Sequence, residues 1–266
     1  MVIVNLPTSR GFPGGWTAAL LFFAGAGLVC AEDAQLKIFA ARADAEFHRA
    51  QVQSQSHPND PAAAQRFARA CFDRADFATN GAERATLAEL GITASRQCVA
   101  HDPKDAAGHY DLALNLGQLA RTETLGALKL VKEMEREFKK ADDLDEHFDQ
   151  AGPARCLGLL YRDAPGWPTS IGSRRKAREW LERAVKLAPE DPENLLNLAE
   201  SRLKWSDRPG AESALQALDA LWPNAQTKLA GEAWERYWYD WSARRVATRL
   251  QIQAASPSPR PPENGH

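Results

Sequence analysis

An eleven-residue segment, DAPGWPTSIGS, holds the residues best suited to contact a ligand or a partner. Its prolines, glycines and tryptophan are typical of an ordered loop rather than of a helix. Two interpretations of Trp167 stay open: the indole contacts a bound molecule, or it packs as a plug on the neighbouring helices. The binding candidates in and beside this segment are Asp163, Trp167, Ser170, Gly172, Ser173, Arg174 and Arg175.

A basic turn follows this segment. Ser173 is expected to cap a helix whose first turn carries Arg174, Arg175 and Lys176. Positive charges there oppose the helix dipole, and an anion held by the free backbone N–H groups and these bases would offset that repulsion. The alternative is that the bases are solvated and pair with downstream acids such as Glu179.

The sequence contains none of the common catalytic or phosphate-binding motifs. H-E-x-x-H, G-x-S-x-G, G-x-x-x-x-G-K-[ST] and C-x-x-C are missing, and the six histidines show no i, i+4 pairing. The acidic run from Ala141 to Asp149 lacks the glycine and the oxygen spacing of a calcium loop, so it is interpreted as a solvated helix end. We predict no enzyme activity, no cofactor and no metal. A hydrolase whose residues meet only in the fold is a remote alternative.

The elements that must position these residues are helices. Apolar residues recur at three- and four-residue steps along most of the chain, as in Ala127, Leu128, Val131, Met134, Phe138 and Ala141. No stretch alternates apolar and polar residues for long enough to predict a strand. The fold class is therefore predicted as all-α.

A repeat at a fixed shift specifies the architecture. Four spaced residues recur 34 residues later: Ala177, Leu181, Ala184 and Pro189 reappear as Ala211, Leu215, Leu218 and Pro223. This is the tetratricopeptide (TPR) period, in which the proline ends the second helix of each unit. We predict a tetratricopeptide-like helical-repeat solenoid with capping helices and place the clearest repeats at residues 151–189 and 190–223.

The flanks of the array are also predicted to be helical. Upstream lie two degenerate repeats and helices near residues 34–55 and 60–79, while Gly158 is expected to allow a close approach of two helices. Downstream, a terminal helix is placed at residues 224–253, where Trp234, Trp238 and Trp241 share one face. That face is expected to cover the open end of the solenoid. Were it exposed, it would be a partner interface or the interface of a homo-oligomer.

Three segments resemble bacterial exported TPR proteins. They are HYDLALNLGQLART (His109 to Thr122), GLLYRDAPGWPTSIGS (Gly158 to Ser173) and KAREWLERAVKLAPEDPENLLNLAE (Lys176 to Glu200). In particular, they look like the TPR-type T component of periplasmic TRAP solute transporters. This resemblance implies a periplasmic protein that associates with a solute-binding partner and lines a ligand cavity with helices.

Polar residues on the first helices of the repeats are the second group of binding candidates. First helices line the concave surface of such arrays, which makes candidates of Asn115, Gln118, Arg121, Asn194 and Asn197. In peptide-binding TPR proteins an asparagine at the position of Asn197 holds a C-terminal carboxylate together with nearby bases. Here Arg202 and Lys204 are near, but the preceding repeat lacks matching bases.

The two ends of the chain are not expected to belong to the fold. An apolar run from Trp16 to Val29 is shorter than a membrane span and predicts a signal peptide, residues 1–31, cleaved after Ala31. Acylation of Cys30 in a lipoprotein is the alternative. The solenoid then covers residues 32–254, and the proline-rich stretch at 255–266 is predicted to be disordered. Within the solenoid, Cys71 and Cys98 either form a disulfide or are small buried side chains.

Composition narrows the class of partner. The formal net charge is -2, with 33 basic and 35 acidic residues, which argues against nucleic acid. We predict an exported, periplasmic or extracellular, non-enzymatic binding protein without a membrane span after processing. It would hold a protein partner or a small solute as an accessory of an envelope transport system. The alternative is a purely structural scaffold in an envelope complex.

Overall fold

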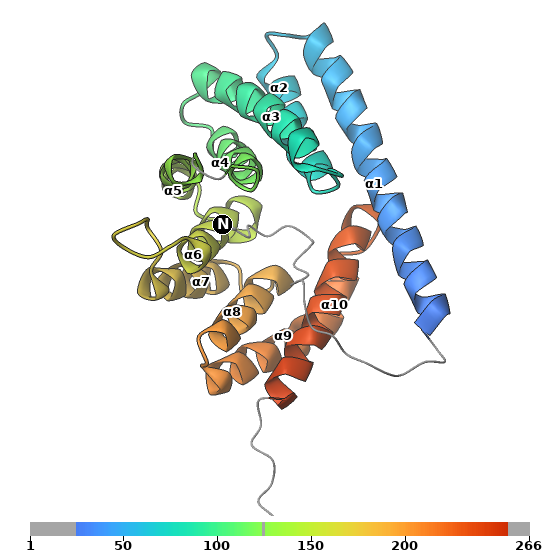
Figure 1. Cartoon of the computed structure of the whole chain (residues 1–266), viewed down its shortest axis with the longest axis vertical. Helices are drawn as coiled ribbons and strands as arrows, with labels where there is room; N and C mark the ends of the chain where they lie inside the picture. Colours follow the sequence, from blue (N-terminus) through green and yellow to red (C-terminus); the bar gives the residue numbers. More distant parts are fainter. Residues whose placement is uncertain (1–24, 124–125, 255–266) are drawn as a thin grey trace, which may run out of the picture. The chain divides into compact units, whose positions relative to one another are not determined.

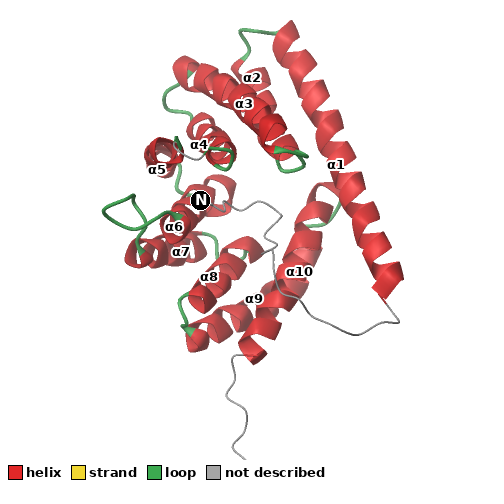
Figure 2. Cartoon of the chain, in the orientation of Figure 1, coloured by secondary structure: helices red, strands yellow, loops and turns green. Residues whose placement is uncertain are grey.

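The computed structural model describes residues 25–123 and 126–254. Most of the predicted signal peptide, residues 1–24, and the predicted tail, residues 255–266, lie outside the described residues and stay predictions. Every named element in the described part of the chain is an α-helix (Figure 2), which confirms the all-α fold class.

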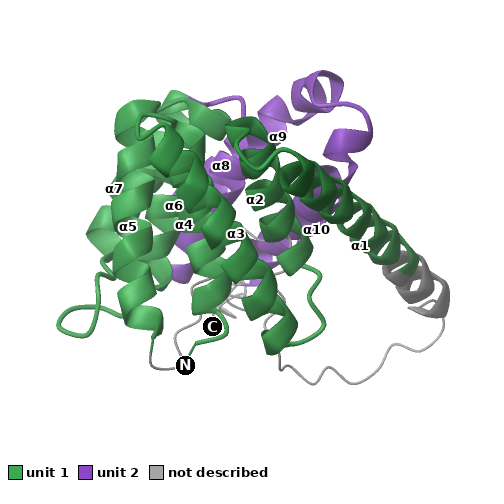
Figure 3. Cartoon of the chain, turned by 90° about the horizontal axis from the view of Figure 1, so that it is seen from above, with its two compact units in different colours: residues 1–187 green, residues 188–266 purple. Residues whose placement is uncertain are grey.

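The chain divides into two compact units, residues 1–187 and residues 188–266 (Figure 3). The helices of the first unit are α1 (Gly25–Ser56), α2 (Pro61–Ala75), α3 (Gly81–His101), α4 (Ala106–Ala120), α5 (Ala127–Leu144), α6 (Phe148–Asp163) and α7 (Arg174–Leu187). Those of the second unit are α8 (Pro192–Lys204), α9 (Arg208–Lys228) and α10 (Glu232–Ala254).

Side-chain caps determine where many of these helices begin. An oxygen of the residue before the helix accepts a backbone N–H of the first turn, which would otherwise have no partner. Pro61 and Pro192 occupy the first positions of α2 and α8, where a missing N–H is not needed. The capping residues are Asp60, Asn80, Asp105, Asp191 and Asp207.

Consecutive helices form hairpins (Figure 1). In the first unit α2 packs on α3, α4 on α5 and α6 on α7, and α3 and α5 each also contact the following helix. In the second unit α8 packs on α9, and α10 covers parts of both. Because each hairpin leaves an apolar face for its neighbour, stacking gives one continuous core within a unit. This arrangement is the predicted helical-repeat architecture.

The repeated residues form that core. Ala177, Leu181 and Ala184 are fully buried on α7, and their counterparts on α9 are buried as well. A β-carbon on Gly158 of α6 would lie 2.6 Å from the Leu181 Cγ. The close approach predicted for Gly158 is therefore confirmed, and Leu181 fills the space that the glycine leaves.

The end of α9 differs from the prediction. Pro189 follows α7, which ends at Leu187, but Pro223 lies inside α9, which continues to Lys228. Packing holds the helix on both sides of the proline: Trp222 meets Trp238 of α10 at 5.0 Å between ring centroids, and Ala225 is buried. The terminal helix accordingly begins at Glu232 rather than near residue 224.

The acidic run at the end of α5 also differs from the prediction. We interpreted Ala141 to Asp149 as a solvated helix end, but the Asp142 carboxylate is buried and lies 3.1 Å from the Arg183 Nη2. Asp149 begins a left-handed stretch of three residues and accepts a hydrogen bond from Tyr110. The Asp142 carboxylate therefore joins α5 to α7, because a buried carboxylate needs a partner. Asp149 joins α6 to α4 from an exposed position, and Asp143 and Asp145 are exposed as well, as the interpretation of a solvated end requires.

Candidate functional site

The predicted loop segment begins with Asp163, the last residue of α6, and residues 164–173 form a loop closed at its base by backbone contacts. The Gly172 N donates to the Pro165 O at 2.8 Å, and the Ser173 N donates to the Tyr161 O at 2.9 Å. A β-carbon on Gly172 would lie 2.0 Å from the Ala164 O, so only glycine fits this crossing. The loop thus holds its own shape between α6 and α7.

Trp167 stands at the tip of this loop, where 88% of its surface is exposed. The turn behind it is held by Thr169 N and Ser170 N, which both donate to the Gly166 O, at 3.1 and 3.2 Å. The interpretation of Trp167 as a plug packed on neighbouring helices is wrong, since the indole meets solvent. Closure of the loop at its base removes the need for the indole as an anchor.

Two polar residues, Asp163 before the loop and Ser170 within it, face the protein, whereas Thr169 is exposed. The Asp163 side chain is buried and receives two hydrogen bonds from Arg162, from Nε at 2.9 Å and from Nη2 at 2.7 Å. The Ser170 Oγ is buried and has no hydrogen-bond partner in the part of the chain that the structure describes. Neither side chain extends from the tip, where Trp167 is the large apolar side chain that the loop presents to solvent.

The basic turn of α7 is paired within the chain. The Ser173 Oγ accepts the Lys176 N at 3.3 Å, as expected of a capping residue. Arg175 lies 2.6 Å from Glu179, and the Lys176 ammonium lies 5.0 Å from the centroid of the Tyr161 ring. These contacts favour pairing with nearby groups over the anion site.

The first-helix candidates of the first unit are structural. The Asn115 Nδ2 donates to the Ala68 O at 3.0 Å, and the Gln118 Nε2 donates to Asp76 at 2.7 Å. Arg121 donates to the Gln118 Oε1 at 3.1 Å. The expectation that Asn115 and Gln118 line an open surface is wrong for both: they are buried and tie α4 to α2.

In the second unit, both asparagine candidates are buried as well. Asn194 donates to the Ala188 O at 3.3 Å and shapes the start of α8. Asn197 donates to Glu193 at 2.8 Å and accepts the Arg244 Nη2 at 2.6 Å. Both ends of the Asn197 amide are therefore engaged within the chain, and its N–H group already holds the Glu193 carboxylate in place of a peptide carboxylate.

A polar cluster in the first unit was not predicted. The Arg69 Nη2 lies 2.9 Å from the Asp111 carboxylate, and the Tyr110 hydroxyl donates to Asp149 at 2.8 Å. Arg155 approaches the Asp149 carboxylate at 3.4 Å. Burial of Asp111 raises the pKa of its carboxyl to about 6, although Arg69 opposes this. The cluster links α2, α4 and α6. Its members are far apart in the sequence, so no sequence motif could predict it.

A second unpredicted cluster surrounds Arg244 on α10. Its guanidinium contacts Glu193 and Glu200 of α8 and Asp240 of its own helix. Burial raises the pKa of Asp240 to about 6, which Arg244 opposes and Glu193 reinforces. Burial lowers the pKa of Arg244, but Glu193 and Glu200 outweigh it and hold that pKa well above its ordinary value.

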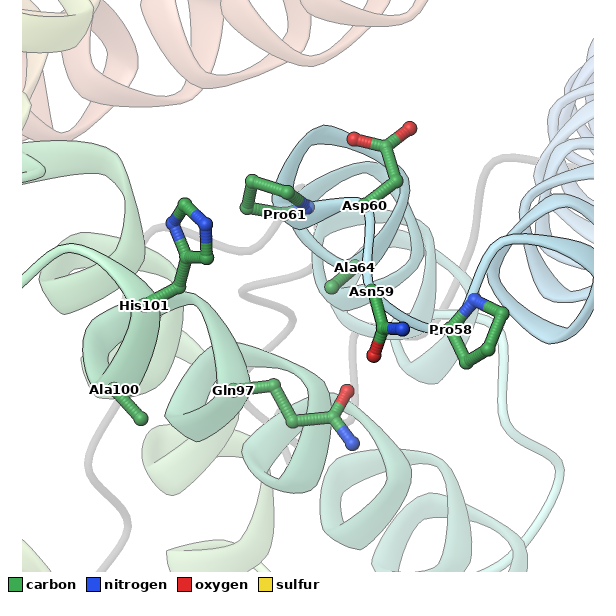
Figure 4. Close-up of a pocket in the computed structure, with 8 residues that line it drawn as sticks. All are labelled: Pro58, Asn59, Asp60, Pro61, Ala64, Gln97, Ala100 and His101. Carbon is green, nitrogen blue, oxygen red and sulfur yellow. The ribbon is translucent and has the colours of Figure 1, made fainter.

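A cavity of about 360 Å³ lies between the α1–α2 connection and the end of α3. Figure 4 shows Gln97 and His101 of α3 on one wall and Asn59 and Pro61 on the other. The carboxylate of Asp60, beside them, accepts the Ala62 N as the cap of α2. The groove has mixed polarity and a broad opening, and none of its polar groups is buried.

Two further features of the described residues concern metals and membranes. They contain no cluster of three or more histidine, cysteine or acidic side chains arranged to hold a metal ion. None of their helices combines the length and apolar character needed to span a bilayer.

Cys71, Cys98 and Cys156 are free and buried. This favours the interpretation of Cys71 and Cys98 as small buried side chains over a disulfide between them.

Comparison with known proteins places the fold. The sequence matches no protein-family model and no curated protein. The structure is similar to the crystal structure of a thermophilic TPR protein from Thermus thermophilus, with a TM-score of 0.56 and 20% sequence identity. The alignment covers 82% of this chain and 95% of that chain. The likeness supports the TPR-like helical-repeat fold.

Proposed function

We propose that this chain is an exported, non-enzymatic TPR-like binding protein that holds a protein partner as an accessory of an envelope transport system. The observation that carries the proposal is Trp167, presented to solvent on a loop that closes itself. Tryptophan is among the residues that contribute most to protein interfaces. A loop already ordered before binding loses little conformational entropy on contact.

A protein is favoured over a small solute as the ligand of this loop. Small molecules are bound in concave sites that bury most of their surface. Trp167 protrudes instead, and Asn115, Gln118 and Asn197 are engaged in contacts within the chain. Export and the role in transport rest on the predicted signal peptide and on the resemblance to the TRAP-associated proteins.

Co-purification from an envelope fraction tests the proposal. The tagged chain is compared with Trp167→Ala and with the control Leu250→Ala. The control also removes an exposed apolar side chain, but from α10 instead of the loop. We expect Trp167→Ala to reduce recovery of the partner at least about tenfold, in line with the loss of one central aromatic contact, while Leu250→Ala has no effect. Equal recovery with all three chains would contradict the proposal.

The half-exposed aromatic face of α10 supports the second candidate, a structural scaffold in an envelope complex. Tyr237 is exposed and packs on Trp241 at 5.6 Å between ring centroids. A partner that is lost with Tyr237→Ala and retained with Trp167→Ala would favour the scaffold role through α10.

A further inference from the structure

The guanidinium of Arg244 finds a hydrogen-bond acceptor for each of its five N–H groups. Nε donates to the Glu200 Oε1 at 2.9 Å, and Nη2 donates to the Glu200 Oε2 at 2.8 Å and to the Asn197 Oδ1 at 2.6 Å. Nη1 donates to the Glu193 Oε1 at 2.9 Å and to the Asp240 Oδ2 at 3.0 Å. An arginine side chain has five such donors, so its capacity is filled.

Four of these five acceptor contacts belong to α8. Glu193, Asn197 and Glu200 are spaced by four and three residues and therefore share one face of the helix. The Asn197 Nδ2 donates to the Glu193 Oε1 at 2.8 Å, which turns the Asn197 oxygen toward the guanidinium. The α8 face thus receives a guanidinium group, and a contact within α8 orients its asparagine.

The negative charge of this α8 face suits a cationic group of another molecule. Three carboxylates, those of Glu193, Glu200 and Asp240, converge on one guanidinium. The two α8 carboxylates remain when α10 moves away, and they then attract another cation. The Arg244 side chain keeps 19% of its surface exposed, so solvent reaches the edge of the site.

Helix α10 contacts both α8 and α9, and part of its surface is exposed. Within α10 the fully buried residues are Trp241, Thr248 and Ile252, whereas Val246 and Leu250 are exposed. The Trp241 Nε1 also donates to the Glu193 carboxylate, and Arg245 and Arg249 pair with Asp219 of α9. The contacts of Arg244 therefore supply one part of what holds α10 in place. A group that replaced Arg244 would weaken the attachment of this helix.

We propose that the α8 face is an arginine-binding site, that Arg244 occupies it in cis, and that an arginine on a partner protein competes with α10 for it. The planar fork of arginine can reach Glu193, Asn197 and Glu200 together. The compact ammonium of lysine has three donors and cannot span the three acceptor side chains in the same way.

The first test is complementation of Arg244→Ala by N-acetyl-argininamide, followed by thermal unfolding. We expect a saturable rise in Tm of at least about 2 °C for this variant, and no rise for the intact chain. N-acetyl-lysinamide should give less than half of that rise. Arg249→Ala is the matched control because it removes another arginine of α10, one that pairs with Asp219 instead. It should not respond.

If Arg244→Ala does not fold by itself, the same titration is followed by far-ultraviolet circular dichroism. Recovery of helix with the arginine probe and not with the lysine probe supports the site. An equal response to both probes, or to neither, overturns it.

The second test addresses competition in the intact chain. Saturating N-acetyl-argininamide should increase hydrogen exchange at the α10 amides at least about fivefold, as expected for partial release of the helix, and N-acetyl-lysinamide should not. Unchanged exchange of α10, at a concentration that saturates Arg244→Ala, would overturn displacement of α10 by arginine.

Discussion

The side chain of Asn115 lies in the space where a side chain on Gly91 would be. A β-carbon on Gly91 would come within 2.1 Å of the Asn115 Oδ1, closer than any packed pair of atoms. Asn115 also donates to the Ala68 O at 3.0 Å, so it cannot move aside without breaking a buried hydrogen bond. Gly91 of α3 and Asn115 of α4 therefore determine how closely these two helices approach.

Gly91→Ala should destabilise the protein by about 1–3 kcal/mol, the usual effect of adding a methyl group to a packed core. The measurement is urea-induced unfolding. Gly81→Ala is the control, because nothing lies within 4 Å of a β-carbon at the exposed first position of α3. The control should be neutral or slightly stabilising, since alanine favours helix over glycine. A Gly91→Ala chain as stable as the control would show that Asn115 can be repositioned freely.

Gly172→Ala should disrupt the base of the Trp167 loop. The added β-carbon would clash with the Ala164 O at 2.0 Å, a backbone atom that cannot rotate away. We expect a loss of about 1–3 kcal/mol and faster proteolysis within residues 163–173. Gly166→Ala, across the same bridge, meets its nearest atom at 3.8 Å and should leave both properties unchanged. Equal proteolysis of the two variants would contradict the closed base.

Protonation of Asp111 should make stability depend on pH. The pKa of its carboxyl is about 6 in the folded chain because burial disfavours the charged form, against about 3.9 when unfolded. The folded state thus binds the proton more tightly. The contribution of Asp111 to stability is greatest below about pH 4 and falls by up to about 3 kcal/mol as pH rises to about 6.

Unfolding free energies of the unaltered chain and of Asp111→Asn, measured from pH 4 to pH 7, isolate this contribution. The difference between the two chains should change across that range, because the asparagine cannot titrate. Glu89→Gln, which changes an exposed carboxylate, is the control and should run parallel to the unaltered chain. A constant difference for Asp111→Asn would mean that Arg69 keeps Asp111 charged throughout.

The thiols of Cys71, Cys98 and Cys156 should resist alkylation while the protein is folded. Burial raises the pKa of Cys71 to about 12 and the pKa values of Cys98 and Cys156 to about 11. Since the thiolate is the reactive form, little labelling by iodoacetamide is expected at pH 8. Labelling should be complete in concentrated urea. Mass spectrometry of the peptides reports each site, and rapid labelling of folded Cys98 would show that α3 opens locally.

Much of the fold is predictable from sequence because its signals are local or periodic. The 34-residue recurrence of Leu181 as Leu215 identifies the helix hairpins, and Gly158 marks a close approach, as the structure bears out. Pro223 misled the placement of a helix end, because its local tendency to end a helix is outweighed by the packing of Trp222 on α10.

The candidate site was predictable only in part. The composition of residues 163–173 indicates a loop, but the exposure of Trp167 depends on the contacts of Gly172 with the Ala164 and Pro165 carbonyls. The cluster around Arg244 joins residues about fifty positions apart, from Glu193 to Arg244. A weaker signal was present: the spacing of Glu193, Asn197 and Glu200 places three acceptors on one helix face.

The self-closed base of the Trp167 loop also separates the tip from the architecture of the array. Because the Gly172 N and the Ser173 N bond to the backbone of Pro165 and Tyr161, the α6 and α7 ends stay joined whatever side chain stands at the tip. We therefore expect the exposed residues 167–169 to accept other side chains, a graft or a fluorescent label without a change in the pairing of the two helices. The loop tip is therefore a suitable position at which to introduce a new binding sequence into this protein.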